Sequence, residues 1–254
     1  MGAELSTIWY VDSPRPALAL RGYPAPDARS GQAIARVLFD DDVTPLGQVP
    51  LAHVAAGTPD VLYVGVYPGV TVVCADFPAT MLPSELPEHW RRAGSSGRTL
   101  FVASSVAGAR AGFAEWRGEE LRRSFSADAA DIFEDIGVPQ VWERPFWAGE
   151  FPMTYPLDVF PDPQMLPFHP QRFAEAANRA WLGFRYTAVQ PDDAIDPARL
   201  LVHGFRAGAP VAPAPPQVPE TRNPDPAPPA DHGEQSPAPA KRSPSLLRWL
   251  GFKA

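Results

Sequence analysis

The sequence predicts an α+β body with a mixed, largely antiparallel sheet and a few helices, followed by a disordered, proline-rich tail. Two pairs of β-rich segments around short turns predict hairpins, apolar residues at helical spacing alternate with them, and twelve prolines fall within residues 209–244. We expect one globular domain over residues 1–208, a disordered linker over 209–244 and a short basic amphipathic peptide over 245–254.

The first part of the body alternates strand and helix signals. Residues 7–11 form a β-branched and aromatic run that predicts a strand, and residues 29–39 carry apolar side chains at helical spacing. The β-rich runs 61–67 and 70–75 flank Pro68-Gly69, so they predict a hairpin with a tight turn. Each of these segments ends at residues that favour turns.

The remaining elements continue the alternation. Residues 83–93 begin with proline and predict a short helix, and residues 99–105 predict a strand. Residues 111–116 and 121–126 predict a second hairpin, and residues 171–184 place aromatic and small apolar side chains on one helical stripe. The first six elements follow the order β-α-β-β-α-β, which is that of a ferredoxin-like sheet, and the second hairpin extends such a sheet.

Residues 139–170 combine eight prolines with seven aromatic side chains, a composition that leaves almost no room for a helix or a central strand. We interpret this stretch as an irregular aromatic belt that packs over a face or edge of the sheet. The alternative is a groove for a peptide or small ligand with Glu143 and Glu150 at its rim. The candidate binding residues of the belt are Trp142, Trp147 and Phe151.

The charge of the body argues against nucleic acid as its main partner. The chain carries a net charge of −7, and because four basic and no acidic side chains follow residue 240, the first 240 residues carry −11. Binding to phosphates requires a basic surface. The single cysteine permits no internal disulfide, and no apolar run reaches 18 residues, so we expect a cytoplasmic protein, with peripheral attachment to the inner membrane face as the second expectation.

The residue types that usually carry chemistry form no catalytic pattern. Cys74 alternates with Val70 and Val72 along a predicted strand, which favours a buried structural thiol over a nucleophile. The histidines lack metal-site spacing, and they are His53, His89, His169, His203 and His232. Phosphate-binding loops, GxSxG elbows and HExxH helices are not present in the sequence. We therefore expect no catalytic residue, cofactor or resident metal.

Two acidic groups supply the enzyme alternative. Asp40-Asp41-Asp42 follows the first predicted helix, and a second group follows the second hairpin at Asp128, Asp131, Glu134 and Asp135. Solvated turns explain both groups. A hydrolase that uses these carboxylates with a divalent ion is the competing hypothesis, although no fixed spacing identifies the ligands.

The end of the tail is a basic amphipathic peptide. The only two lysines of the chain, Lys241 and Lys253, lie in its last 14 residues. The candidate binding residues are Leu246, Leu247, Arg248, Trp249, Leu250, Phe252 and Lys253. Such a peptide fits an anionic membrane surface, a groove on a partner protein or the acidic surface of the body itself.

Four separated segments resemble an uncharacterised domain family of actinobacteria. They are Tyr67–Cys74, Glu134–Gly137, Glu143–Glu150 and Leu166–Pro170. The resemblance covers about residues 1–186 and implies a bacterial protein of unknown function, without assigned catalytic residues.

These observations together favour a non-enzymatic adaptor or interaction module with a tethered docking peptide. The hydrolase is the first alternative. The second is an inhibitor or immunity-type protein whose acidic surface neutralises a basic partner. The oligomeric state does not follow from the sequence.

Overall fold

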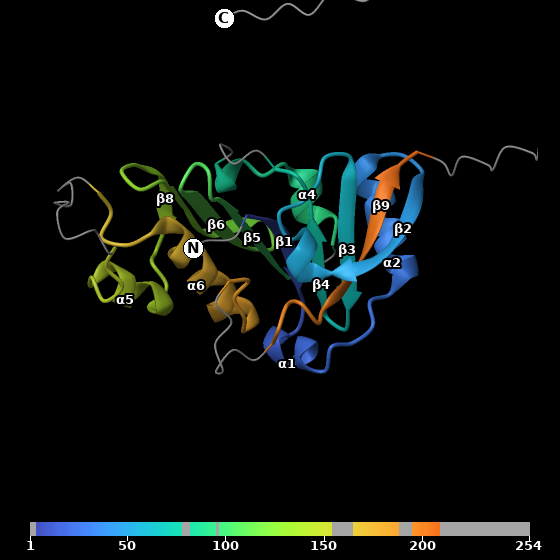
Figure 1. Ribbon diagram of the computed structural model, residues 1–254, viewed down its shortest axis with the longest axis horizontal. Coiled ribbons are helices and arrows are strands. Elements are labelled where there is room, and N and C mark those ends of the chain that lie inside the picture. Colours follow the sequence, from blue (N-terminus) through green and yellow to red (C-terminus); the bar gives the residue numbers. More distant parts are fainter. Residues whose placement is uncertain (1–3, 78–81, 95–96, 154–164, 188–194, 209–254) are drawn as a thin grey trace, which may run out of the picture. The chain divides into compact units, whose positions relative to one another are not determined.

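The computed structural model describes residues 4–77, 82–94, 97–153, 165–187 and 195–208. In these residues, nine strands form one sheet in the order β2-β9-β3-β4-β1-β5-β6-β7-β8 (Figure 1). Every neighbouring pair is antiparallel, which confirms the predicted α+β class with a largely antiparallel sheet. The expectation that the sheet is mixed is wrong, because the described strands include no parallel pair.

The strands are β1 (Leu5–Val11), β2 (Val43–Pro50), β3 (Val61–Tyr67), β4 (Val70–Cys74), β5 (Arg98–Ser105), β6 (Arg110–Arg117), β7 (Glu120–Ala127), β8 (Ile132–Gly137) and β9 (Leu201–Ala207). The helices are α1 (Pro16–Arg21), α2 (Ala28–Phe39), α3 (Leu51–Val54), α4 (Glu88–Arg92), α5 (Arg144–Trp147) and α6 (Pro170–Leu182), with single 3₁₀ turns η1 (Pro83–Glu85) and η2 (Val141–Glu143).

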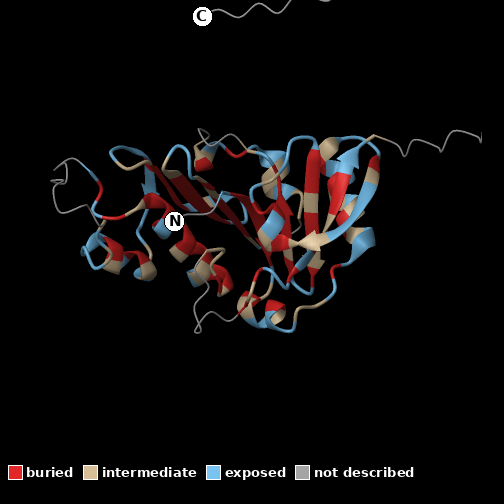
Figure 2. Cartoon of the chain, in the orientation of Figure 1, coloured by how far each residue is buried: buried red, intermediate tan, exposed pale blue. Residues whose placement is uncertain are grey.

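Helices cover both faces of the sheet, so its central strands are buried from two sides. All seven residues of β1 are buried, and the neighbouring strands carry long runs of buried residues (Figure 2). Burial on both faces explains why β1 reads as a continuous apolar and β-branched run instead of a strict alternation.

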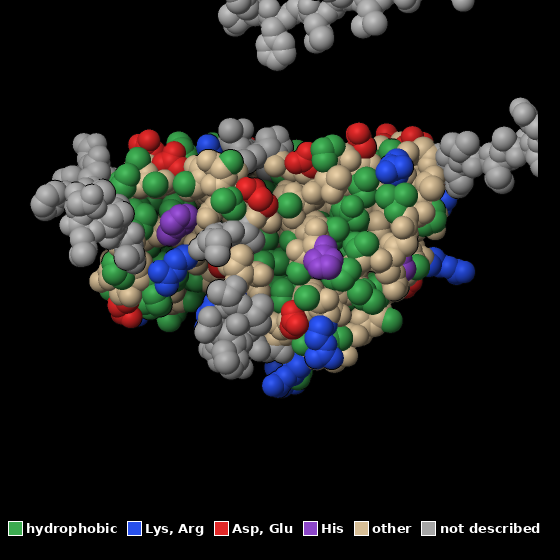
Figure 3. Space-filling view, in the orientation of Figure 1, with side chains coloured by type: hydrophobic (Ala, Val, Ile, Leu, Met, Phe, Trp, Pro, Cys, Tyr) green, Lys and Arg blue, Asp and Glu red, His purple; other side chains and the backbone are tan. Residues whose placement is uncertain are grey.

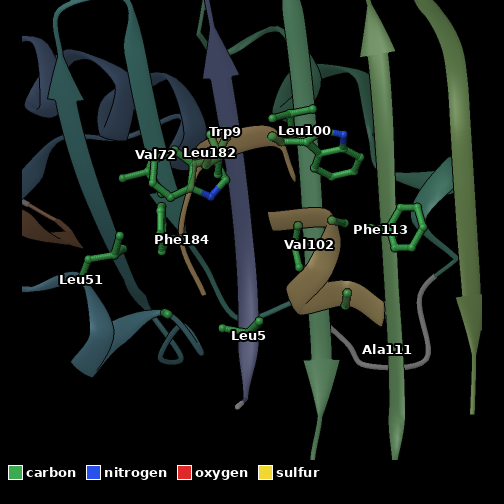
Figure 4. Packing of buried hydrophobic residues seen from close by; sticks show 14 of the residues in the cluster. Leu5, Trp9, Leu51, Val72, Leu100, Val102, Ala111, Phe113, Leu182 and Phe184 are labelled. Carbon is green, nitrogen blue, oxygen red and sulfur yellow. The ribbon is translucent and has the colours of Figure 1, made fainter. Parts of the chain in front are cut away.

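One face packs against α6. Trp9 of β1 is paired with Val72 of β4 and Leu100 of β5, and the three side chains lie on the same face (Figure 4). The ring of Trp9 meets Phe184, which follows α6, edge to face at 5.8 Å between centroids. Gly183 ends the helix in the left-handed conformation with φ 86°, and this turn carries the chain from α6 to the buried Phe184.

The opposite face packs against α2 and α4. Asp27 caps α2 by accepting hydrogen bonds from the N–H groups of Arg29 and Ser30, as expected for an aspartate in front of an amphipathic helix. Tyr10 of β1 points to this face, and its hydroxyl donates to the carbonyl of Trp90 in α4. The two faces of the same strand thereby hold helices from distant parts of the sequence.

Most predicted elements agree with the structure. The predicted strands and both hairpins correspond to β1, β3, β4, β5, β6 and β7, and the two longer helices correspond to α2 and α6. The single helix predicted over residues 83–93 is wrong. Pro87 separates η1 from the five-residue α4, because proline removes a hydrogen-bond donor and favours an extended residue before it.

Several elements were not expected from the sequence. Strand β2 enters the chain between α2 and β3, so the predicted element order β-α-β-β-α-β is interrupted. Strand β9, formed by residues 201–207, lies between β2 and β3. The acidic stretch interpreted as a solvated turn contains β8, and α1 and α3 are also additions to the prediction.

No helix within the described residues is long and apolar enough to cross a lipid bilayer.

His169 caps α6 with its imidazole ring, and this contact links stability to pH. Its Nδ1 accepts a hydrogen bond from the N–H of Gln171 at 3.3 Å, so the nitrogen must be unprotonated. Burial, together with the positive charge of Arg172, lowers the pKa of His169 below its ordinary value of 6.5. The stabilisation is therefore complete above about pH 6.5 and is lost as the pH falls through the folded-state pKa.

We expect the melting temperature to fall more steeply between about pH 7 and about pH 5 in the native chain than in His169→Asn. Asparagine keeps an N-cap acceptor and does not titrate in this range. His169→Ala should lose about 1 kcal/mol at neutral pH. Thermal unfolding followed by circular dichroism measures all three chains, and equal slopes for the native chain and His169→Asn would contradict the capping role.

Candidate functional site

The main polar centre of the body lies at Arg123 of β7. Its guanidinium group forms a bidentate pair with Glu143 of η2, with Nε to Oε1 at 2.9 Å and Nη2 to Oε2 at 2.8 Å. Nη1 donates to the carbonyl oxygens of Ser124 and Ile136, both at 3.0 Å, and to the carboxylate of Asp135. One side chain thus joins β7, β8 and the start of the aromatic belt.

Burial makes this pair energetically demanding. The side chains of Arg123 and Glu143 are 1% and 0% exposed, so neither charge is solvated by bulk water. Burial alone lowers the pKa of Arg123, but hydrogen bonds and the negative charges of Glu143 and Asp135 raise it more, and the net pKa lies above its ordinary value. The guanidinium therefore stays charged and requires its carboxylate partners.

A second buried contact connects the belt to the sheet through Gln140. Its side-chain oxygen accepts hydrogen bonds from the Nε1 atoms of Trp142 at 2.8 Å and Trp181 at 3.0 Å. Its side-chain nitrogen donates to Glu115 of β6, which also pairs with Arg98 of β5 at 2.8 Å. These contacts fix the orientation of two indole rings that would otherwise carry unsatisfied N–H groups.

The three candidate aromatic residues of the belt lie in different packing contacts. Trp142 packs on Phe113 of β6 at 5.4 Å between ring centroids, and Trp147 packs on Phe168 at 5.0 Å. Phe151 meets Phe146 at 4.5 Å. In its described residues, therefore, the belt packs over one face of the sheet.

Two details of the belt differ from the prediction. Glu143 is completely buried, so its expected place at the rim of a groove is wrong, while Glu150 is exposed. The belt also contains η2 and α5. Proline is tolerated in α5 because Pro145 occupies its first turn, where the backbone N–H has no partner within the helix. The sequence predicted almost no room for a helix or a central strand in this stretch, and in its described residues before Pro170 the structure has these two short helical segments and no strand.

Glu134 forms a polar contact that the sequence prediction missed. It is 7% exposed and accepts a hydrogen bond from the backbone N–H of Ser84 in η1 at 3.1 Å, and the hydroxyl groups of Ser84 and Ser124 also donate to it. A Cβ atom on Gly112 of β6 would lie 2.9 Å from Cγ of Pro83, so glycine permits the close approach of η1 to the sheet. The alternation of Ser124 and Ser126 with Phe125 could have indicated a polar face at this position.

The acidic groups of the hydrolase alternative do not converge. Asp42 pairs with Arg36 at 3.3 Å, and the carboxylate of Asp128 accepts from the backbone within its own turn. Glu134 and Asp135 reach opposite faces of β8, to Ser84 and Arg123 respectively. Within the described residues, no three histidine, cysteine, aspartate or glutamate side chains are placed to hold a metal ion.

A surface hollow of about 680 Å³ opens beside the belt at the end of β8. Trp142, Leu121, Val138 and Val141 supply its apolar wall. Its charged lining consists of Glu115, Arg117, Glu120 and Arg122. Arg117 and Arg122 pair with Glu115 and Glu120, so this lining is nearly balanced in charge.

The candidate residues of the C-terminal peptide, from Leu246 to Lys253, lie outside the described residues. In the space-filling view, acidic side chains gather along the upper edge of the visible face, whereas basic side chains are more scattered (Figure 3).

A comparison with protein-family models matches residues 5–205 to a family of unknown function, DUF6928. The chain belongs to this family. A search of the curated proteins and a search of the solved structures found no match to this chain. The match agrees with the predicted resemblance to an uncharacterised domain family and extends it through β9 of the DUF6928 domain.

Removal of one partner from the central pair of the DUF6928 domain should strongly destabilise it. We expect Glu143→Gln to lose about 3–5 kcal/mol, because it removes the charged bidentate partner of the buried Arg123 and leaves only the partly exposed Asp135 as a carboxylate partner. The double variant Arg123→Met with Glu143→Leu should be less destabilised than Glu143→Gln. Urea unfolding measures these differences, and the exposed Glu150→Gln is the matched control, expected within about 0.5 kcal/mol of the native chain.

Cys74 provides an independent probe of the same fold. It is fully buried, which confirms the predicted structural thiol, and burial raises its pKa well above the ordinary range of a thiol. We expect a thiol reagent such as Ellman's reagent to label the native chain only as it unfolds, and to label Glu143→Gln faster. Rapid stoichiometric labelling of the folded native chain would contradict this assignment.

Proposed function

We propose that the chain is a non-enzymatic adaptor, in which the DUF6928 body is tethered by a proline-rich linker to a docking peptide. The observation that carries this proposal is the composition of residues 245–254, which combine five large apolar side chains with two basic ones. A further basic pair, Lys241 and Arg242, lies shortly before them. The body also supports the adaptor proposal, because its buried charged groups bind one another and stabilise the fold. The pair of Arg123 and Glu143 is the main example.

The peptide has the chemistry of a weak membrane anchor. Partial insertion of its five apolar side chains would contribute about 5 kcal/mol, and four basic groups near an anionic surface about 1 kcal/mol each. Ordering the peptide and localising the body offset much of this free energy. The expected attachment is reversible and sensitive to salt, and a hydrophobic groove on a partner protein would accept the same peptide.

We also infer that the four central strands form a ferredoxin-like unit. Their order β3-β4-β1-β5 and the packing of α2 and α4 on the same face support this inference. In this interpretation β2, β9 and the strands from β6 to β8 are additions at the two sides of the unit.

The inhibitor or immunity-type function remains the second proposal, favoured by the net charge of −11 over the first 240 residues. It requires a tight complex with a basic protein that dissociates at high salt. The hydrolase has less support, because its acidic side chains point in different directions.

We expect Trp249→Ala combined with Leu250→Ala to abolish sedimentation of the full chain with vesicles of phosphatidylserine and phosphatidylcholine, because the largest apolar side chain of the peptide and its apolar neighbour are both lost. Val218→Ala in the linker is the control and should sediment like the native chain. The melting temperature of the body should be the same in all three proteins.

Pure phosphatidylcholine vesicles and high salt separate the possible attachments. Sedimentation only with the anionic vesicles, and only at low salt, supports the membrane anchor. If the native chain sediments with neither vesicle, the membrane surface is excluded and a partner protein is the remaining target of the peptide. Unchanged sedimentation of the double variant would contradict the role of the peptide altogether.

A further inference from the structure

The two edge strands of the sheet differ in how they are protected. Edge strand β2 contains Pro45 and Pro50, and its register shifts between Pro45 and Gly47. Prolines and bulges are common devices that prevent an edge from pairing with another chain. Edge strand β8 contains no proline, and among the strands that the structure describes it has a neighbour only on the side of β7.

The exposed side of β8 is apolar. Its pairing with β7 includes one bulge at Phe133, after which Glu134–Gly137 pair regularly. The exposed apolar residues of this edge are Ile132 (44%), Phe133 (40%), Ile136 (43%), Val138 (82%) and Val141 (75%). An apolar edge strand with no neighbouring strand on its outer side is the surface to which an extended peptide can add as a further strand.

The hollow of about 680 Å³ continues this edge. Gly137 and Val138, at the end of β8, form part of its lining together with Trp142 and Leu121. In strand addition, backbone hydrogen bonds supply affinity and adjacent pockets that accept side chains supply specificity. The edge of β8 supplies the backbone groups, and the hollow supplies a pocket for side chains.

The charge of this edge selects the kind of peptide. Residues 124–143 contain five acidic and no basic side chains. Arg123 neutralises part of this charge through Glu143 and Asp135, but Asp131 is exposed and Glu134 is held by serine hydroxyl groups. Arg110 of β6 adds one positive charge to this edge, because its guanidinium lies 3.9 Å from the centroid of the Phe133 ring. The carboxylates still outnumber the basic groups, which favours basic side chains on the added strand.

The same charge disfavours a second copy of this chain at the edge. Pairing β8 with β8 of another copy would bring two sets of Asp131, Glu134 and Asp135 together without added basic groups. Like charges on neighbouring strands are destabilising. A partner of opposite charge is the better fit.

We propose that β8 and the adjoining hollow bind an extended peptide segment of a partner protein in which basic and apolar side chains alternate. The segment adds to the sheet as a tenth strand, with its apolar side chains over Ile136 and in the hollow and its basic side chains near Asp131 and Asp135. This inference goes beyond the tail-mediated attachment and concerns a different part of the chain.

The test uses the full chain and an acetylated, amidated octapeptide in which lysine and valine alternate, with the glutamate–valine octapeptide as its charge control. Hydrogen exchange read by mass spectrometry reports which backbone amides become protected. We expect the lysine peptide to slow exchange within residues 128–143 and the glutamate peptide to have no effect. Raising the salt from about 50 mM to about 300 mM should weaken binding several-fold.

Matched substitutions on the two edges locate the site. Ile136→Lys on β8 places a positive charge where the basic peptide lies, and should weaken its binding at least tenfold. Leu46→Lys on β2 changes a side chain of nearly equal exposure, 44% against 43%, and should leave binding unchanged. Asp131→Lys, in the exposed turn before β8, is the second variant if Ile136→Lys alters the circular dichroism spectrum of the fold.

Three results would overturn the proposal. The first is protection confined to residues outside 115–143, or no protection at millimolar peptide. The second is equal protection by the glutamate peptide. The third is concentration-dependent protection of residues 128–143 without peptide, which would indicate self-association. The chain with Trp249→Ala and Leu250→Ala is measured in parallel. If this variant loses vesicle binding and keeps peptide binding, the two sites act independently. A failure of vesicle binding then counts against the adaptor function, and a failure of peptide binding counts against this inference.

Discussion

The buried pair of Arg123 and Glu143 is the interaction on which the arrangement of β7, β8 and the belt depends. A charge inside a protein is tolerated only where partners replace its hydration, and here the partners come from η2, from β8 and from β7 itself. Because the carboxylate of Glu143 belongs to η2, the belt cannot leave the sheet without removing the bidentate partner of Arg123. This constraint selects one register of the belt over others with similar apolar contact.

Packing on two faces gives the rest of the body its order. Strand β1 is buried along its whole length, and its alternate side chains serve two different sets of helices. Trp9 contributes to the face of α6, and Tyr10 contributes to the face of α2 and α4. A shift of β1 by one residue would exchange the two sets of side chains, so the register of the central sheet is strongly determined.

The sequence was informative where local signals and tertiary packing agree. Apolar runs and turn residues predicted β1, the two hairpins and α6, and the alternation of Val70, Val72 and Cys74 predicted the burial of the thiol. Strand β2 was missed because Pro45, Gly47 and Pro50 resemble a loop, and β8 was missed because its carboxylates resemble a solvated turn.

The partners of those carboxylates lie on other elements, which a local pattern cannot reveal. For the central pair, one signal was present in the sequence. Arg123 alternates with Phe125 along β7, which indicates a charged residue on the apolar face of that strand.

Strand β9 is the last strand of the body to be synthesised. Strand β9 pairs with both β2 and β3, so β2 has no place in the sheet until residues near 207 have left the ribosome. Such distant pairing makes folding slow and leaves early strands exposed during synthesis. The sheet of the body is therefore complete only after its last strand has been made, and β2 lacks its neighbouring strand until then.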